Sequence, residues 1–206
     1  MSLAGNPDQW TPDAYLAFER RSDAKHELID GRLVAMSGAS RAHAALGARL
    51  SGLLYERLRA CGCQAFTSDL RVQAGEPGQY TYPDLSVVCG EVLLEDDQGD
   101  TMLNPTRLVE VLSPSTQACD RGAKFRRYQG IASLKDYILV SQDQPLVEVF
   151  SRADGGRWLY SSAEGLASVI EAPSLGCTIE LAELYEGMLF DAAAETPEET
   201  GAAKPI

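Results

Sequence analysis

The sequence has little of what marks secreted, zinc-binding or membrane proteins. Its 206 residues include two histidines and five cysteines, and no stretch approaches the roughly 18 apolar residues that span a membrane. The first ten residues lack a charged segment followed by an apolar run, which disfavours a signal peptide. The odd number of scattered cysteines predicts reduced thiols in a cytoplasmic protein. Zinc is disfavoured because a site needs about four ligands at recognisable spacings, and the one close cysteine pair is Cys61 and Cys63.

A surplus of basic residues is also missing. The formal net charge is -12, which argues against a protein that simply coats nucleic acid, because that binding depends on Lys and Arg. Residues 91–100 carry five carboxylates and no base, and residues 183–206 carry six carboxylates against one lysine. We expect both acidic segments to lie outside the core. Residues 107–135 carry six bases against two acids, so a nuclease, whose site itself contains carboxylates, stays open.

What is present is an ordinary globular composition, with 45% hydrophobic and 23% charged residues. It predicts a single domain over residues 1–190 and an acidic, disordered tail over residues 191–206. The first half reads as a helix over residues 11–21, a β-hairpin turning at Asp30 and Gly31, and a long helix in which leucines recur at helical spacing up to Gly62.

The second half predicts strands over residues 64–72, 80–89 and 107–112. Pro83 falls within the second of these and indicates an edge or a bulge. Asp120 is then expected to cap a helix over residues 121–129, followed by a short strand over residues 137–140. From residue 146 the pattern changes to a β-meander. The expected fold is therefore α/β, a central mixed β-sheet flanked by helices with an added C-terminal meander.

Two carboxylates lie in apolar strand sequences. Asp84 follows Pro83 and precedes a hydrophobic run, and Glu110 lies in the sequence Leu-Val-Glu-Val-Leu. Such a carboxylate needs a cation, a metal or a hydrogen-bond donor. Carboxylates on neighbouring strands can hold Mg²⁺ together with water and phosphate, but composition alone favours structural pairing with arginine or a solvated face. Lys124, early in the following helix, favours the metal because a lysine can stabilise charge developing on phosphate; alone it reads as a solvated charge.

Taken in order, these motifs resemble those of a known family. The sequence HELIDG at residues 26–31 is followed by Ser40 and His43, the dipeptide Pro83-Asp84, and VEVLSPST at residues 109–116. Then come Asp120, Lys124 and Tyr128 at four-residue spacing, and LKDYILVSQDQPLVEVF at residues 134–150. This set, spread over residues 10–190, resembles the Uma-type restriction endonuclease family of the PD-(D/E)XK nuclease superfamily.

The resemblance implies a restriction-endonuclease-like core and assigns roles to residues. Asp84 is similar to the metal-binding aspartate of the PD element, and Glu110 to the acidic residue of the (D/E)XK element. The lysine two residues after that acid is replaced here by Leu112, and Lys124 matches the family's lysine on the following helix. Glu27 resembles an additional acidic metal ligand. His43 and Tyr128 are expected at the margin of the site, although His43 reads equally well as a core histidine.

The function implied is Mg²⁺-dependent hydrolysis of DNA phosphodiester bonds, with Mn²⁺ as an alternative metal. Asp84, Glu110 and Glu27 would form the metal site, and Lys124 would complete the catalytic set. RNA stays open as a substrate, since such a site acts on phosphate rather than on sugar. A homodimer is expected from the resemblance. The rival hypothesis is a non-catalytic, dimeric binding module that keeps the nuclease fold, and the acidic balance of the chain favours it.

Overall fold

The computed structural model describes residues 9–58, 61–172 and 177–190. Its main element is a six-stranded mixed sheet with the order β11-β10-β9-β8-β6-β3. Neighbouring strands are antiparallel except β8 and β9, which are parallel. The strands are β3 (Cys63–Thr67), β6 (Leu85–Cys89), β8 (Arg107–Leu112), β9 (Asp136–Ser141), β10 (Leu146–Arg152) and β11 (Trp158–Glu164).

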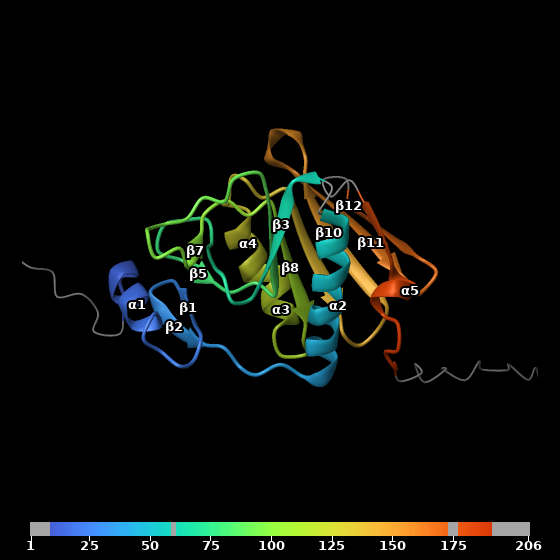
Figure 1. Ribbon diagram of the computed structural model, residues 1–206, viewed down its shortest axis with the longest axis horizontal. Helices are drawn as coiled ribbons and strands as arrows, with labels where there is room; N and C mark the ends of the chain where they lie inside the picture. The colour runs from blue at the N-terminus through green and yellow to red at the C-terminus, as the bar shows by residue number, and fades with distance from the viewer. Residues whose placement is uncertain (1–8, 59–60, 173–176, 191–206) are drawn as a thin grey trace, which may run out of the picture.

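Helices cover both faces of this sheet (Figure 1). The first is α2 (Arg41–Leu58), whose buried leucines pack with Val109 and Val111 of β8. The second connects the parallel strands β8 and β9 and consists of α3 (Gln117–Cys119), a π-helical turn η2 (Asp120–Lys124) and α4 (Phe125–Tyr128). Because side chains alternate along a strand, Leu108 and Leu112 face this second helix. Glu110, between them in sequence, shares their face.

A five-stranded sheet forms the N-terminal side of the molecule, with the order β2-β1-β5-β4-β7 (Figure 1). Asp30 and Gly31 turn the hairpin with φ of 50° and 75°; a positive φ is the backbone that Gly and Asp tolerate best. The elements are α1 (Pro12–Glu19), β1 (His26–Ile29), β2 (Arg32–Ala35), β4 (Arg71–Gln73), β5 (Tyr80–Thr81) and β7 (Thr101–Met102). The expected hairpin and first helix are thus confirmed, and Thr11 caps that helix.

The C-terminal meander is also confirmed. The short turn η3 (Asp154–Gly156) connects β10 and β11. A two-stranded sheet of β12 (Val169–Ala172) and β13 (Cys177–Glu180) comes next, and α5 (Leu181–Leu184) follows it. Ile170 and Ile179 of this hairpin join the core on the α2 side. In the described part of the chain, no helix is long and apolar enough to cross a membrane. The predicted tail at residues 191–206 lies outside the described residues.

Two strand predictions were wrong in extent. Residues 64–72 form two strands, β3 and β4, which belong to different sheets, and residues 80–89 form β5 and β6. The second break falls at Pro83 and Asp84, because proline has no N–H to donate to a strand ladder. The chain therefore passes from one sheet to the other at Asp84, and this places Asp84 at the junction of the two sheets.

The predicted cap and the predicted free thiols were wrong as well. The helix starts at Gln117 after Thr116, so Asp120 lies inside it, buried, instead of at its start. Cys63 and Cys89 form a disulfide between the paired strands β3 and β6, with Cα atoms 4.0 Å apart. The register makes them direct cross-strand neighbours, which a sequence separation of 26 residues does not reveal. Cys61 and Cys119 are free.

Candidate active site

A pocket of about 920 Å³ lies at the junction of the two sheets. The start of α2 and the segment before it form one wall, and β1, β8 and the π-helical turn contribute the others. Titratable side chains from five separate segments reach this pocket. These segments contribute Glu27, His43, Asp84, Glu110, Asp120 and Lys124.

Glu110 and Lys124 form the centre of the site. The ammonium nitrogen of Lys124 lies 2.8 Å from Oε1 of Glu110, and the hydroxyl of Tyr128 donates to the same oxygen at 2.9 Å. Both partners come from the helix after β8, and both reach Glu110 because it points to the face that this helix covers. Thr81 Oγ1 lies 3.1 Å from the Tyr128 hydroxyl. Tyr128, predicted at the margin, is therefore a buried partner of Glu110.

Asp84 is held beside this pair. Its Oδ2 accepts a hydrogen bond from the backbone N–H of Val111 at 2.7 Å, and Nε2 of His43 lies 3.2 Å from the same oxygen. Leu85 pairs with Val109 in the sheet, so the antiparallel register brings Asp84 next to the Glu110–Val111 peptide. His43 reaches Asp84 from the first turn of α2, where its own N–H donates to Ser40 Oγ.

Two further carboxylates contact Lys124. Oε1 of Glu27 lies 3.7 Å from the ammonium nitrogen and accepts from the backbone N–H of Tyr82 at 3.2 Å. Oδ1 of Asp120, one turn before Lys124 on the same helix, lies 3.8 Å from it. Sequence reasoning assigned Asp120 to a cap and missed its place in the pocket; its four-residue spacing from Lys124 was the available signal. The π-helical turn spans both residues, and such turns are frequent at functional sites.

The site gathers more negative than positive charge. Glu27, Glu110 and Asp120 contact one lysine, Lys124, and Asp84 lies in the same pocket. Burial raises the pKa of Glu110 to about 8, and Asp84 and Asp120 act in the same direction. Burial also raises the pKa of Asp120. For Lys124, burial acts to lower the pKa, but the neighbouring carboxylates outweigh it and raise the pKa well above its usual value. A bound cation would relieve this excess of carboxylates.

The carboxylates of the pocket also change the pKa of His43. Its hydrogen bond to Asp84 raises its pKa above the ordinary value, and burial opposes this shift only in part. His43 lines the pocket, as expected for a residue at the margin of the site, and it is not an apolar core histidine. The structure places His43 as a partner of Asp84, on the side of the pocket formed by α2.

The carboxylates of the pocket fit a magnesium ion that has few protein ligands. Among the described residues, no group of three His, Cys, Asp or Glu side chains is arranged to hold a metal alone. Mg²⁺ commonly takes one or two carboxylates and completes its shell with water and phosphate. Asp84 and Glu110 each use one oxygen in the contacts above, and their second oxygens accept no hydrogen bond within the described chain. Those two oxygens are suitable hard ligands.

The arginines of the helix after β8 lie outside this arrangement. Arg121 pairs with Glu148 of β10 at 2.5 Å, and Arg127 pairs with Asp30 of the first hairpin at 3.0 Å. Neither residue lines the pocket. The local basic surplus of residues 107–135 is thus used largely in ion pairs within the fold.

Comparison with known proteins agrees with the resemblance seen in the motifs. Residues 12–182 match the family described as "Uma2: Putative restriction endonuclease". The chain is 37% identical over 180 residues to the uncharacterized protein slr1290 of Synechocystis, covering 87% of this chain and 93% of the relative. It is 32% identical over 161 residues to sll1609 of the same organism, covering 78% and 91%.

A solved structure shares the fold. It is the crystal structure of a putative nuclease belonging to DUF820 from Anabaena variabilis, with a TM-score of 0.71 and 17% sequence identity. The match covers 87% of this chain and 99% of the other. The fold is the mixed α/β, restriction-endonuclease-like one that the motifs imply. The extent of the sequence match, together with this fold, shows that the chain belongs to the Uma2 family.

Proposed function

We propose that this protein is a metal-dependent endonuclease that hydrolyses DNA phosphodiester bonds, with Mg²⁺ or Mn²⁺ as the metal. The observation that carries the proposal is the meeting of Asp84, Glu110 and Lys124 in one pocket. Three separate segments contribute these side chains. An ion pair that only stabilised the fold would not need to line a pocket. The name of the family and the description of the Anabaena protein as a nuclease support the same reaction class.

Each residue has a distinct role in this proposal. Asp84 and Glu110 would hold the metal, with Glu27 as a further acidic ligand. When bound, the cation polarises the phosphodiester and lowers the pKa of water. Lys124 would orient the attacking water and stabilise the negative charge that develops on phosphate. The hydrogen bond from Val111 and the contact with His43 fix the orientation of Asp84.

The charge of the pocket explains why a metal should be necessary. Two lysines line the pocket in the described chain, and both are already paired: Lys25 with Asp69 at 2.5 Å and Lys124 with Glu110 at 2.8 Å. A phosphate backbone therefore meets carboxylates rather than unpaired cations, and repulsion between them opposes binding. The metal would reverse this repulsion locally. A homodimer and a cytoplasmic location stay predictions.

The test is cleavage of linear duplex DNA, single-stranded DNA and RNA with Mg²⁺, Mn²⁺ or EDTA. We expect metal-dependent cleavage by the wild-type protein, and a loss of at least about 100-fold in Asp84→Asn and Glu110→Gln. Glu148→Gln is the matched control, because Glu148 is also a buried strand carboxylate paired with a basic residue of the same helix, but it lies outside the pocket.

The outcomes separate the enzyme from its rival. Cleavage that survives in EDTA contradicts metal dependence, and cleavage of RNA alone contradicts the DNA assignment. Binding of Mn²⁺ by the wild-type protein but not by Asp84→Asn, without cleavage of any substrate, would favour the non-catalytic module. Equal cleavage by Glu110→Gln and Glu148→Gln would remove the pocket from the mechanism.

A further inference from the structure

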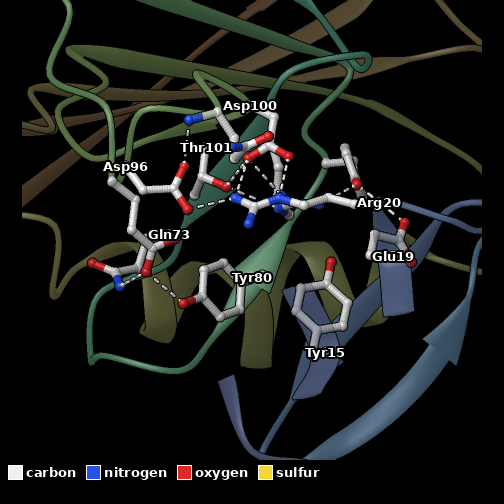
Figure 2. Close-up of polar contacts among 12 residues, drawn as sticks. Tyr15, Glu19, Arg20, Gln73, Tyr80, Asp96, Asp100 and Thr101 are labelled. Carbon is white, nitrogen blue, oxygen red and sulfur yellow. Dashed lines mark hydrogen bonds and ion pairs between the residues drawn. The ribbon is translucent and has the colours of Figure 1, made fainter. Parts of the chain in front are cut away.

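The acidic segment 91–100 is tied to the fold by specific contacts. Nη2 of Arg20 lies 2.7 Å from Asp96, and its Nε donates to Asp100 at 2.8 Å. Figure 2 shows Arg20 extending between these two carboxylates, with Glu19 beside it on the chain. The segment therefore fastens the end of α1 to the five-stranded sheet through Asp96 and Asp100.

Asp100 also reaches a second, buried arginine. Arg71 is 2% exposed, and its Nη2 lies 2.9 Å from Asp100 Oδ1. Its Nε donates to Thr101 Oγ1 and its Nη1 to the Tyr82 hydroxyl, both at 3.0 Å. The guanidinium is thus fixed on several sides, and it presents one N–H to Tyr82 in a rigid direction.

Tyr82 connects this network to the pocket. Its hydroxyl donates to Glu19 Oε1 at 3.0 Å, and the same oxygen accepts the backbone N–H of His26 at 2.8 Å. The backbone N–H of Tyr82 donates to Glu27 Oε1. Glu27 is therefore held twice, through the neighbouring backbone at His26 and through its own carboxylate. Asp84 lies two residues beyond Tyr82, across the rigid Pro83.

We propose that Tyr82 is a positioning residue for the site, set in place by Arg71, Glu19 and the acidic segment 91–100. It touches no reacting group; it fixes the backbone from which Asp84 projects and the hydrogen bond that holds Glu27. Its effect on rate rests on the proposed nuclease function. Its effect on the geometry of Glu27 does not, so the two can be tested apart.

The chain offers a matched control in Tyr80. Tyr80 is also a buried tyrosine of the same stretch, and its hydroxyl donates to Glu95 of the same acidic segment at 2.6 Å. It has no hydrogen bond to Glu27 or Glu19 among those the structure describes. Tyr82→Phe and Tyr80→Phe each delete one hydroxyl bound to a carboxylate. Tyr82→Phe also removes the acceptor of Arg71 Nη1, so it should reduce thermal stability more, and both variants are compared at a temperature where both are fully folded.

The rate measurement separates positioning from stability. With metal and DNA, we expect Tyr82→Phe to lower kcat by about tenfold while KM changes by less than about twofold, because alignment is lost but substrate contacts are kept. Tyr80→Phe should keep the wild-type kcat. Equal kcat values for the two variants, measured where both are fully folded, would overturn the proposal.

Amide exchange gives a readout that needs no catalysis. The N–H of residue 82 is the donor to Glu27, so its hydrogen exchange, followed by NMR, should be about tenfold faster in Tyr82→Phe than in Tyr80→Phe. Equal exchange in both variants contradicts positioning, whether or not the protein cuts DNA. If the N–H of residue 82 exchanges faster in Tyr82→Phe and the wild-type protein cuts no substrate, the positioning of Glu27 is retained and the proposed nuclease function is rejected.

Discussion

The pocket and the acidic segment 91–100 both gather carboxylates, and the fold treats the two groups in opposite ways. In the pocket, Glu110 is buried and shares one lysine with its neighbours, and burial raises its pKa to about 8. In the segment, Asp100 lies between Arg20 and Arg71, and the hydrogen bond from Arg20 leads the effects that lower its pKa to about 2. The carboxylates of the pocket therefore outnumber its cations, whereas Asp100 alone contacts two arginines.

The contrast shows how a chain with a net charge of -12 can contain a pocket whose carboxylates are not matched by cations. Carboxylates that stabilise the fold are matched with arginine, whose planar group can bind two carboxylates at once. Those of the pocket are left under-compensated, at a cost in stability that a structural role would not require. Tyr82 lies between the two regions, because its hydroxyl contacts Arg71 and Glu19 and its backbone N–H donates to Glu27.

The largest effect is expected from removing Lys124, the lysine that contacts three carboxylates of the pocket. Lys124→Met leaves Glu110, Glu27 and Asp120 without their cation. Cleavage should fall at least about 100-fold. The free energy of unfolding should fall by about 3 kcal/mol, because the buried carboxylates that contacted Lys124 must either take up protons or stay charged without a cation. Arg126→Met, an exposed neighbour on the same helix, is the control for urea unfolding and activity. An unfolding free energy as high as that of the control would contradict the described ion pairs.

The second prediction compares the two arginines that share Asp100. Arg71 is buried, while the side chain of Arg20 is 27% exposed. Arg71→Met should lower the free energy of unfolding by about 3 kcal/mol, since it strands buried partners, and Arg20→Met by about 1 kcal/mol or less. Chemical denaturation of both variants measures the difference. If Arg20→Met proves the more harmful, α1 and its exposed contacts matter more than the buried network.

Much of the candidate site was accessible from sequence because its signals are local. Glu110 interrupts an apolar strand, Pro83-Asp84 precedes one, and Lys124 lies at helical spacing from Tyr128. Strand alternation then explains why Glu110 faces the helix that carries Lys124. The order of the motifs, matched to a family, indicated the restriction-endonuclease-like fold, which the comparisons confirm.

The contacts that could not be predicted from the sequence are those between residues far apart in the chain. Arg71 and Tyr82 read as ordinary members of short strands, and their contacts come from segments that only the folded chain brings together. Cys63 and Cys89 meet through strand register, and the acidic segment looked solvated because Arg20 is 76 residues away from Asp96. Asp120 was misplaced because the helix begins four residues earlier than its capping pattern indicates. Local patterns identify candidate groups, and the tertiary fold decides their partners.

The finest test of the contrast is the pH dependence of stability without metal. The ordinary pKa of Asp100 is 3.8 and its folded pKa is about 2, so its stabilising effect is present above pH 3.8 and is lost as pH falls towards 2. Glu110 has the opposite sign, since its pKa rises from 4.5 to about 8 on folding. Its stabilising effect is complete below pH 4.5 and is lost as pH rises through 8.

Unfolding curves in EDTA between pH 2 and 9 should therefore separate two variants. Asp100→Asn should flatten the loss of stability on the acid side, and Glu110→Gln should flatten the decline towards alkaline pH. Asp97→Asn, an exposed position of the same acidic segment, removes the same formal charge and serves as the control. An unchanged slope between pH 5 and 8 in Glu110→Gln would mean that Lys124 fully compensates the pocket. The contrast between an under-compensated site and a satisfied segment would then be lost, and with it the electrostatic reason for a metal.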